Sequence, residues 1–120
     1  MENKEGKERR GVQRFPIILD IEWEGFSGRS SGTISDVSES GCFVLSGKDV
    51  SDGESVRLFI PMGDGMKAQF NGIVVKHEEE IGFAVRFDPI SAAQRDIVNN
   101  LKVNSSFTAQ HVYREPQELL

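Results

Sequence analysis

The fold is decided by residues 15–36, which read FPIILDIEWEGFSGRSSGTISD. Apolar side chains occupy every second position in the first half of this stretch, as in a β-strand with one face on a core; they are Ile17, Leu19, Ile21 and Trp23. The midpoint of the stretch falls between Gly25 and Phe26, inside the segment Gly-Phe-Ser-Gly, whose glycines permit the positive φ of a tight turn. We therefore predict one β-hairpin whose last residue, Asp36, returns to the side of its first, Phe15.

Four more short strands are predicted after this hairpin, whose own second strand runs from about residue 30 to residue 37. Period-two apolar patterns and turn residues define them, and they span residues 42–45, 56–60, 67–77 and 81–87. Pro61 ends the second of the four, because proline cannot donate a hydrogen bond to a sheet. Short strands with frequent turn signals are typical of an antiparallel barrel that is closed or partly closed.

The apolar period becomes helical after Pro89. Ser91, followed three residues later by Gln94, fits a capping box at the start of a helix. Apolar residues then recur at helical spacing, at Ala93, Ile97, Val98 and Leu101. We expect one amphipathic helix near residues 92–102 that covers an open side or end of the barrel. The predicted fold class is all-β with a C-terminal helix.

The composition excludes several functional classes. The chain has 120 residues, about one domain, and a formal net charge of -5, which argues against a general binder of DNA or RNA. The positive charge is local, because residues 1–14 carry five Lys or Arg against three Glu. No apolar run approaches the roughly 20 residues that span a bilayer, and the start of the chain lacks the apolar centre of a signal peptide. We expect a cytoplasmic protein without membrane insertion.

A single cysteine, Cys42, excludes an internal disulfide and a zinc site built from several thiolates. We expect it to be a small buried hydrophobe. The other interpretation, a thiol nucleophile, needs a histidine within hydrogen-bond reach, and only His77 could provide one. His77 also precedes three glutamates, which we interpret as a solvated acidic turn and not as a metal site. No metal or cofactor is expected.

Two polar clusters flank the predicted hairpin, RGVQR at residues 10–14 and DVSESG at residues 36–41. The planar fork of arginine matches a phosphate and also the O6 and N7 acceptors of guanine. The Asp36 carboxylate can accept hydrogen bonds from the N1–H and N2–H2 donors on the opposite guanine edge. Ser38 adds a hydroxyl donor, and Gly41 permits positive φ and the close approach of a ligand. Taken alone, the first cluster could be a basic tail and the second a Ser or Asx turn, but their convergence favours a guanine-nucleotide site.

These residues are where the chain resembles a known family. Arg10-x-x-x-Arg14 followed by Asp36-x-Ser38-x-x-Gly41 is similar to the paired signature of the PilZ domain, which binds the bacterial second messenger cyclic di-GMP. The likeness extends over about residues 8–102 and includes the number and order of the strands and the closing helix. It implies a six-stranded, Greek-key-like antiparallel β-barrel closed by one amphipathic helix.

The resemblance also implies which residues bind the ligand, namely Arg10, Arg14, Asp36, Ser38 and Gly41. The arginines would contact phosphates and guanine edges, the aspartate and serine would contact base and phosphate groups, and the glycine would permit the turn. Arg9, which precedes the motif, would add a weaker contact. Many relatives place an aromatic side chain on the strand before the last one, whereas residues 74–77 read Val-Val-Lys-His and offer only Lys76 as a minor candidate.

We divide the chain into an N-terminal arm at residues 1–7, a PilZ-like domain at 8–104 and a C-terminal tail at 105–120. The resemblance implies a non-catalytic, single-domain receptor whose arm folds over cyclic di-GMP and so changes the surface offered to a separate protein partner. The alternative is a PilZ-like interaction module that does not bind the nucleotide, an interpretation favoured by the missing aromatic side chain near Lys76.

Overall fold

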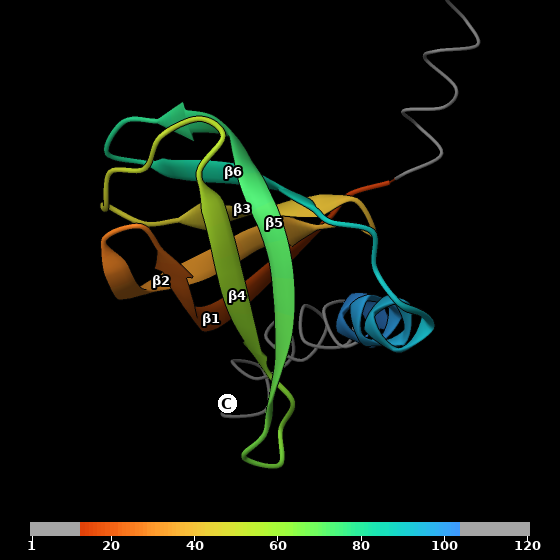
Figure 1. The fold of residues 1–120 in the computed structure, drawn as a ribbon. Helices are drawn as coiled ribbons and strands as arrows, with labels where there is room; N and C mark the ends of the chain where they lie inside the picture. The colour runs from red at the N-terminus through yellow and green to blue at the C-terminus, as the bar shows by residue number, and fades with distance from the viewer. Residues whose placement is uncertain (1–12, 104–120) are drawn as a thin grey trace, which may run out of the picture.

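The computed structural model of the protein describes residues 13–103. Within them, six antiparallel strands close into a barrel in the order β1-β2-β3-β6-β5-β4 (Figure 1). The strands are β1 (Phe15–Gly25), β2 (Gly28–Val37), β3 (Gly41–Leu45), β4 (Ser55–Pro61), β5 (Lys67–Glu78) and β6 (Gly82–Phe87). A helix begins at residue 92 and continues through residue 103. The predicted fold class, a six-stranded antiparallel barrel with one C-terminal helix, is confirmed.

The strand order gives the second half of the barrel the form of a Greek key. Hairpins join β4, β5 and β6 in sequence, while the long connection at residues 46–54 leaves β3 as the neighbour of β6. The pairing of these two strands runs from Gly41 opposite Arg86 to Leu45 opposite Gly82. It therefore sets the end of the DVSESG segment beside the last strand of the barrel.

The β1–β2 hairpin forms with a register that differs from the sequence prediction. Gly25 pairs with Gly28, so the turn is centred one residue later than predicted, and of these two glycines only Gly28 has a positive φ, of 110°. A β-bulge between Pro16 and Leu19 compensates half of the resulting two-residue shift in pairing, so Asp36 is opposite Pro16 and not Phe15. The two ends of the hairpin still meet, as the sequence predicted.

Alternate side chains from all six strands fill the barrel. Trp23 and Phe83 pack edge to face, with ring centroids 4.8 Å apart and an interplanar angle of 67°, and Phe70 and Phe87 have centroids 5.1 Å apart. Cys42 is fully buried among them, as predicted for a small hydrophobe. The strand residues of the core are Ile21, Trp23, Ile34, Val37, Cys42, Val44, Val56, Leu58, Ile60, Phe70, Val74, Phe83, Val85 and Phe87.

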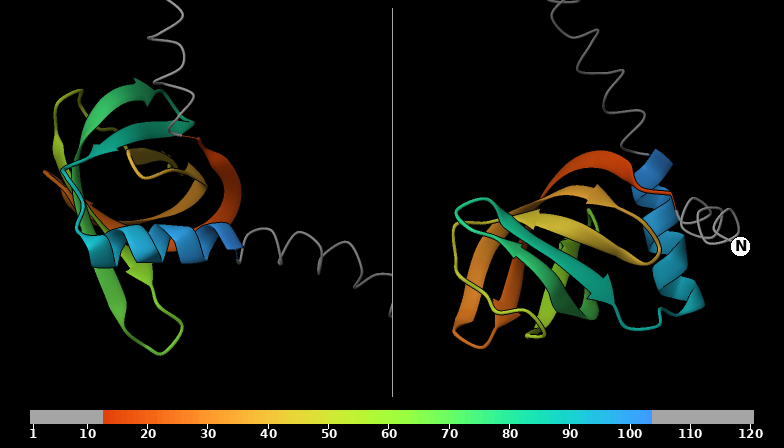
Figure 2. Two further views of the ribbon diagram at one scale, coloured as in Figure 1. Left: turned by 90° about the vertical axis from the view of Figure 1, so that its right-hand side faces the viewer. Right: turned by 90° about the horizontal axis from the view of Figure 1, so that it is seen from above.

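The helix packs across the end of the barrel where β1 begins (Figure 2). The predicted capping box is present, because the Ser91 backbone N–H donates to Gln94 Oε1 at 2.8 Å and the Gln94 backbone N–H donates to Ser91 Oγ at 3.1 Å. Val98 and Leu101 are buried against the barrel core. Within the described residues, no helix is long and apolar enough to cross a membrane.

Candidate functional site

Arg14 of the first predicted motif and Asp36 of the second meet at one end of the barrel. Arg14 precedes β1, Asp36 lies near the end of β2, and Arg14 Nη1 is 3.6 Å from Asp36 Oδ1. The Arg14 side chain is 55% exposed and that of Asp36 is 30% exposed. Asp36 Oδ1 is itself buried and accepts no hydrogen bond from residues 13–103. The carboxylate therefore has acceptor capacity that the described part of the protein does not use.

Ser38 is the residue that shapes the β2–β3 turn. Its side chain is almost fully buried, with the residue only 1% exposed. The Ser40 backbone N–H donates to Ser38 Oγ at 3.1 Å, and the Ser38 backbone N–H donates to the Gly41 carbonyl at 2.8 Å. These contacts make a Ser turn, which is the local role that such residues often have. A direct contact between the Ser38 hydroxyl and a ligand stays a prediction.

Gly41 is required for a different reason from the one that the sequence suggested. Its φ is not positive, in contrast to those of Gly28 and three turn glycines. A Cβ atom at Gly41 would collide with the carbonyl oxygen of Val85 on β6. Glycine therefore permits β3 and β6 to pair closely at this point.

Of the three predicted residues that remain, the structure describes only Lys76, and it does not bring Lys76 to the Arg14–Asp36 pair. Arg9 and Arg10 lie outside the described residues. Lys76, on the outer face of β5, is separated from Asp36 by three strand spacings, about 14 Å. Lys76 Nζ instead lies 3.4 Å from Glu78 Oε2 on the same strand.

Two further side chains, absent from the predicted site, adjoin the DVSESG segment on the outer face. Phe43 on β3 is opposite Asp36, and Arg86 on β6 is opposite Gly41. The alternation of β6, with its phenylalanines and valine inward, could have assigned Arg86 to the outer face. Only the pairing of β3 with β6 sets it beside the motif, because the two strands are far apart in the chain.

A comparison with known protein families identifies this arrangement. The family model described as the PilZ domain matches residues 8–102. The chain belongs to the PilZ domain family. PilZ domains are non-catalytic receptor modules, and the family is one of cyclic di-GMP receptors. No curated protein sequence matched the chain.

Solved PilZ structures share the fold at low sequence identity. The PilZ domain of YcgR from Escherichia coli, solved with cyclic di-GMP, gives a TM-score of 0.64 at 15% identity and covers 93% of this chain and 99% of that one. The PilZ domain of CeSA from a cellulose-synthesizing bacterium gives 0.54 at 18%, covering 72% and 89%. The Bacillus subtilis inhibitor of motility MotI (DgrA) gives 0.61 at 18%, covering 83% of this chain and 52% of that one.

The environment of Cys42 in this PilZ domain argues against thiol chemistry. Burial raises the pKa of the Cys42 thiol above its ordinary value of 9.0, the Asp36 carboxylate raises it further, and Arg14 lowers it. The group is therefore a protonated thiol near neutral pH, whereas a cysteine nucleophile must be a thiolate.

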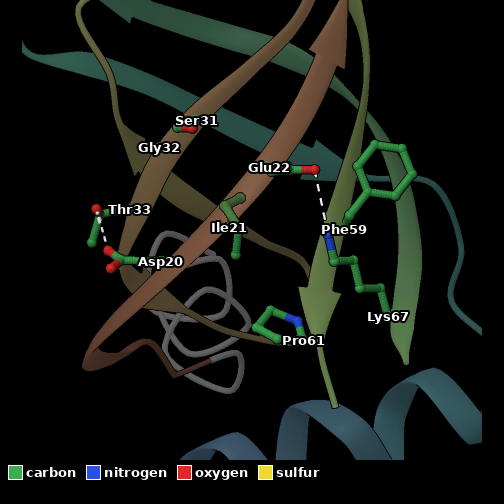
Figure 3. Close-up of a pocket in the computed structure, with 9 residues that line it drawn as sticks. All are labelled: Asp20, Ile21, Glu22, Ser31, Gly32, Thr33, Phe59, Pro61 and Lys67. Atoms are coloured by element: carbon green, nitrogen blue, oxygen red, sulfur yellow. Dashed lines mark hydrogen bonds and ion pairs between the residues drawn. The ribbon is translucent and has the colours of Figure 1, made fainter. Parts of the chain in front are cut away.

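A surface hollow of about 580 Å³ lies over β1, β2, β4 and the start of β5, apart from the motif (Figure 3). None of the predicted site residues lines it. Its polar groups contact one another: Thr33 Oγ1 donates to Asp20 Oδ1 at 2.9 Å, and Lys67 Nζ lies 3.3 Å from Glu22 Oε1.

Within residues 13–103, no group of three or more His, Cys, Asp or Glu is placed to hold a metal ion. The motif end of the barrel remains the candidate site of this PilZ domain.

Proposed function

We propose that this PilZ domain is a non-catalytic receptor for cyclic di-GMP. The observation that carries the proposal is the meeting of Arg14 and Asp36, 3.6 Å apart, at the end of the barrel. The proposed ligand-binding residues are Arg10, Arg14, Asp36, Ser38 and Gly41, with weaker contributions from Arg9 and Lys76. Arg9 and Arg10 enter on their place in the sequence motif alone.

The pair offers chemistry that is complementary to a guanine nucleotide. A half-exposed guanidinium can donate two parallel hydrogen bonds to a phosphate or to O6 and N7 of guanine. The Asp36 carboxylate, with an oxygen that accepts no hydrogen bond from residues 13–103, can accept from the opposite guanine edge. The PilZ domain of YcgR, whose fold this chain shares, was solved with cyclic di-GMP, which supports the choice of ligand.

Signalling is proposed to come from the N-terminal arm at residues 1–7. The arm and the arginines that follow it would close over the ligand bound to the domain at residues 8–104, with residues 105–120 as a tail. This ordering would change the surface that a protein partner contacts. The partner is a second protein of unassigned identity, and the cytoplasm stays the predicted compartment.

Calorimetric titration of the full chain tests the proposal. Cyclic di-GMP at tens of micromolar should give a saturable heat of binding, and cyclic di-AMP should bind more weakly because adenine lacks the N1–H and N2–H2 donors. Equal affinity for the two cyclic dinucleotides would contradict the assignment of Asp36 to a guanine edge. The absence of any heat with cyclic di-GMP overturns the receptor function itself.

A second candidate function is a PilZ interaction module that does not bind the nucleotide. It is favoured by the buried hydroxyl of Ser38, whose contacts are within the turn, and by the ion pair of Lys76 with Glu78. Amide chemical shifts distinguish the two functions. Shifts of Arg14 and Ser38 that stay unchanged as cyclic di-GMP is added support the interaction module, whereas clear movement supports the receptor.

A further inference from the structure

Arg86 differs from the other cations on the strands. Every other arginine or lysine of the six strands lies within 4.0 Å of a carboxylate; they are Arg29, Arg57, Lys67 and Lys76. Arg86 has no such partner among residues 13–103, although it is exposed on the outer face of β6. An exposed arginine without a carboxylate keeps all five of its N–H donors available to an anion.

Arg86 also has an unusual neighbour. It is the cross-strand partner of Gly41, which has no side chain to screen or contact it. Gly41 ends the DVSESG segment, so Arg86 lies across the β3–β6 pair from the end of this motif. Asp36 lies two strand spacings away across β3 and two residues away along the strand direction, which together make about 12 Å. One dinucleotide with two bases and two phosphates can span that distance.

Phe43 completes this part of the outer face. It is opposite Asp36 on one side and Ala84 on the other. A Cβ atom on Gly82 would come within 2.9 Å of Phe43 Cε2, so the ring extends over the backbone of β6. Ala84 also faces outward yet is only 8% exposed, as expected for a residue beside a ring that covers the sheet. Phe43 is therefore a partly buried ring on the outer face that reaches from β3 toward β6.

We infer that the outer face of β3 and β6 is a second wall of the nucleotide site, in which Arg86 contacts a phosphate and Phe43 contacts the face of a guanine base. The inference rests on the proposed function. An aromatic ring or an arginine beside a base gives stacking and cation–π contacts that do not depend on the base. The chain has a net charge of -5, and the two phosphates of cyclic di-GMP are also negative. An arginine without a carboxylate partner supplies positive charge that attracts such a ligand.

Four substitutions in two matched pairs test the inference. Arg86→Gln and Phe43→Leu remove the charge and the ring from the proposed wall. Arg57→Gln and Phe59→Leu make the same changes on β4, which pairs with neither β3 nor β6. Cyclic di-GMP affinity should fall about 10-fold for Arg86→Gln and about 5-fold or more for Phe43→Leu. The two β4 variants should stay within about twofold of the wild type.

The affinities of the wild type and the variants distinguish failure of the receptor function from failure of the proposed second wall. Thermal unfolding of all variants shows whether a loss of affinity comes from loss of fold. If the wild type fails to bind cyclic di-GMP, the proposed function and this inference both fall. If the wild type binds and either β3–β6 variant matches its β4 control, the inference falls for that residue while the receptor function stands. Arg86→Lys should retain more affinity than Arg86→Gln, because lysine also binds phosphate as a point charge, and a loss as large as that of Arg86→Gln overturns the phosphate assignment.

Discussion

The Arg14 guanidinium and the Asp36 carboxylate form an ion pair, 3.6 Å from Nη1 to Oδ1, that joins the entry of β1 to the end of β2. Both side chains are partly exposed, and ion pairs of this kind contribute little to stability, about 0 to 1 kcal/mol. At 3.6 Å the pair is also longer than a hydrogen bond, so either group can turn to a ligand at low cost. The pair is therefore suited to recognition more than to holding the barrel together.

Replacing either partner should lower ligand affinity while leaving the fold intact. Arg14→Ala or Asp36→Asn should cost about 1.5 to 3 kcal/mol in binding, or about 10-fold to 150-fold in Kd, because each removes a charge-assisted contact. Calorimetry with cyclic di-GMP measures the loss. Thermal unfolding should show a change of no more than about 1 kcal/mol. Variants that bind as the wild type does would contradict the assignment of this pair.

Gly41→Ala should damage the barrel itself. The added Cβ would collide with the Val85 carbonyl oxygen on the paired strand, so β3 and β6 must move apart. Overpacking of this kind typically costs about 1 to 3 kcal/mol, measurable by urea unfolding. Gly47→Ala is the matched control, because a Cβ there meets no atom within 4 Å. Equal stability of the two variants would show that β3 and β6 tolerate a side chain between them.

Glu54 should be a strong determinant of stability without a part in binding. The residue is only 5% exposed, and its carboxylate accepts from the Phe26 backbone N–H at 2.7 Å and from the Ser51 backbone N–H at 2.9 Å. Glu54→Ala leaves both donors without this partner and should cost about 2 to 4 kcal/mol in urea unfolding. Glu79→Ala, in the exposed β5–β6 turn, should have almost no effect. If Glu54→Ala lowers the free energy of unfolding by less than about 1 kcal/mol, these two hydrogen bonds are not a strong source of stability.

Cys42 should be inert in the native protein. Burial and the Asp36 carboxylate raise the pKa of its thiol, so a thiol-specific reagent should react only after urea unfolds the chain. The unfolded state releases the thiol proton near its ordinary pKa of 9.0, whereas the native state retains it. Stability from this group is therefore complete below about pH 9 and falls above it, by up to about 1.4 kcal/mol per pH unit.

A matched variant isolates this dependence on pH. Cys42→Ala should be less stable at neutral pH because it leaves a small cavity, but it should lose less stability than the wild type between about pH 8 and pH 10. Urea unfolding at several pH values measures both. Rapid reaction of the native thiol at neutral pH would show that the β3 end of the barrel opens locally.

The sequence alone determined the strands, the helix and the residues of the motif. The alternation of residues 15–24 and the capping box of Ser91 and Gln94 are local signals, because a strand period or a cap is complete within a few residues. The predicted hairpin also implied that Arg14 and Asp36 would meet, since the two ends of a hairpin lie side by side. The sequence did not predict the exact register, because the turn lies one residue later than predicted and a bulge near Pro16 compensates only part of that shift.

Only the tertiary structure decided which strands became neighbours across the barrel. β3 and β6 are separated by more than thirty residues of chain, and no local pattern states that they pair. That pairing explains why residue 41 must be glycine, which the sequence attributed to a turn, and it sets Arg86 and Phe43 beside the motif. The physical reason is that strand pairing at long separation depends on closure of the whole barrel, whereas strand and helix formation depend on the order of nearby side chains.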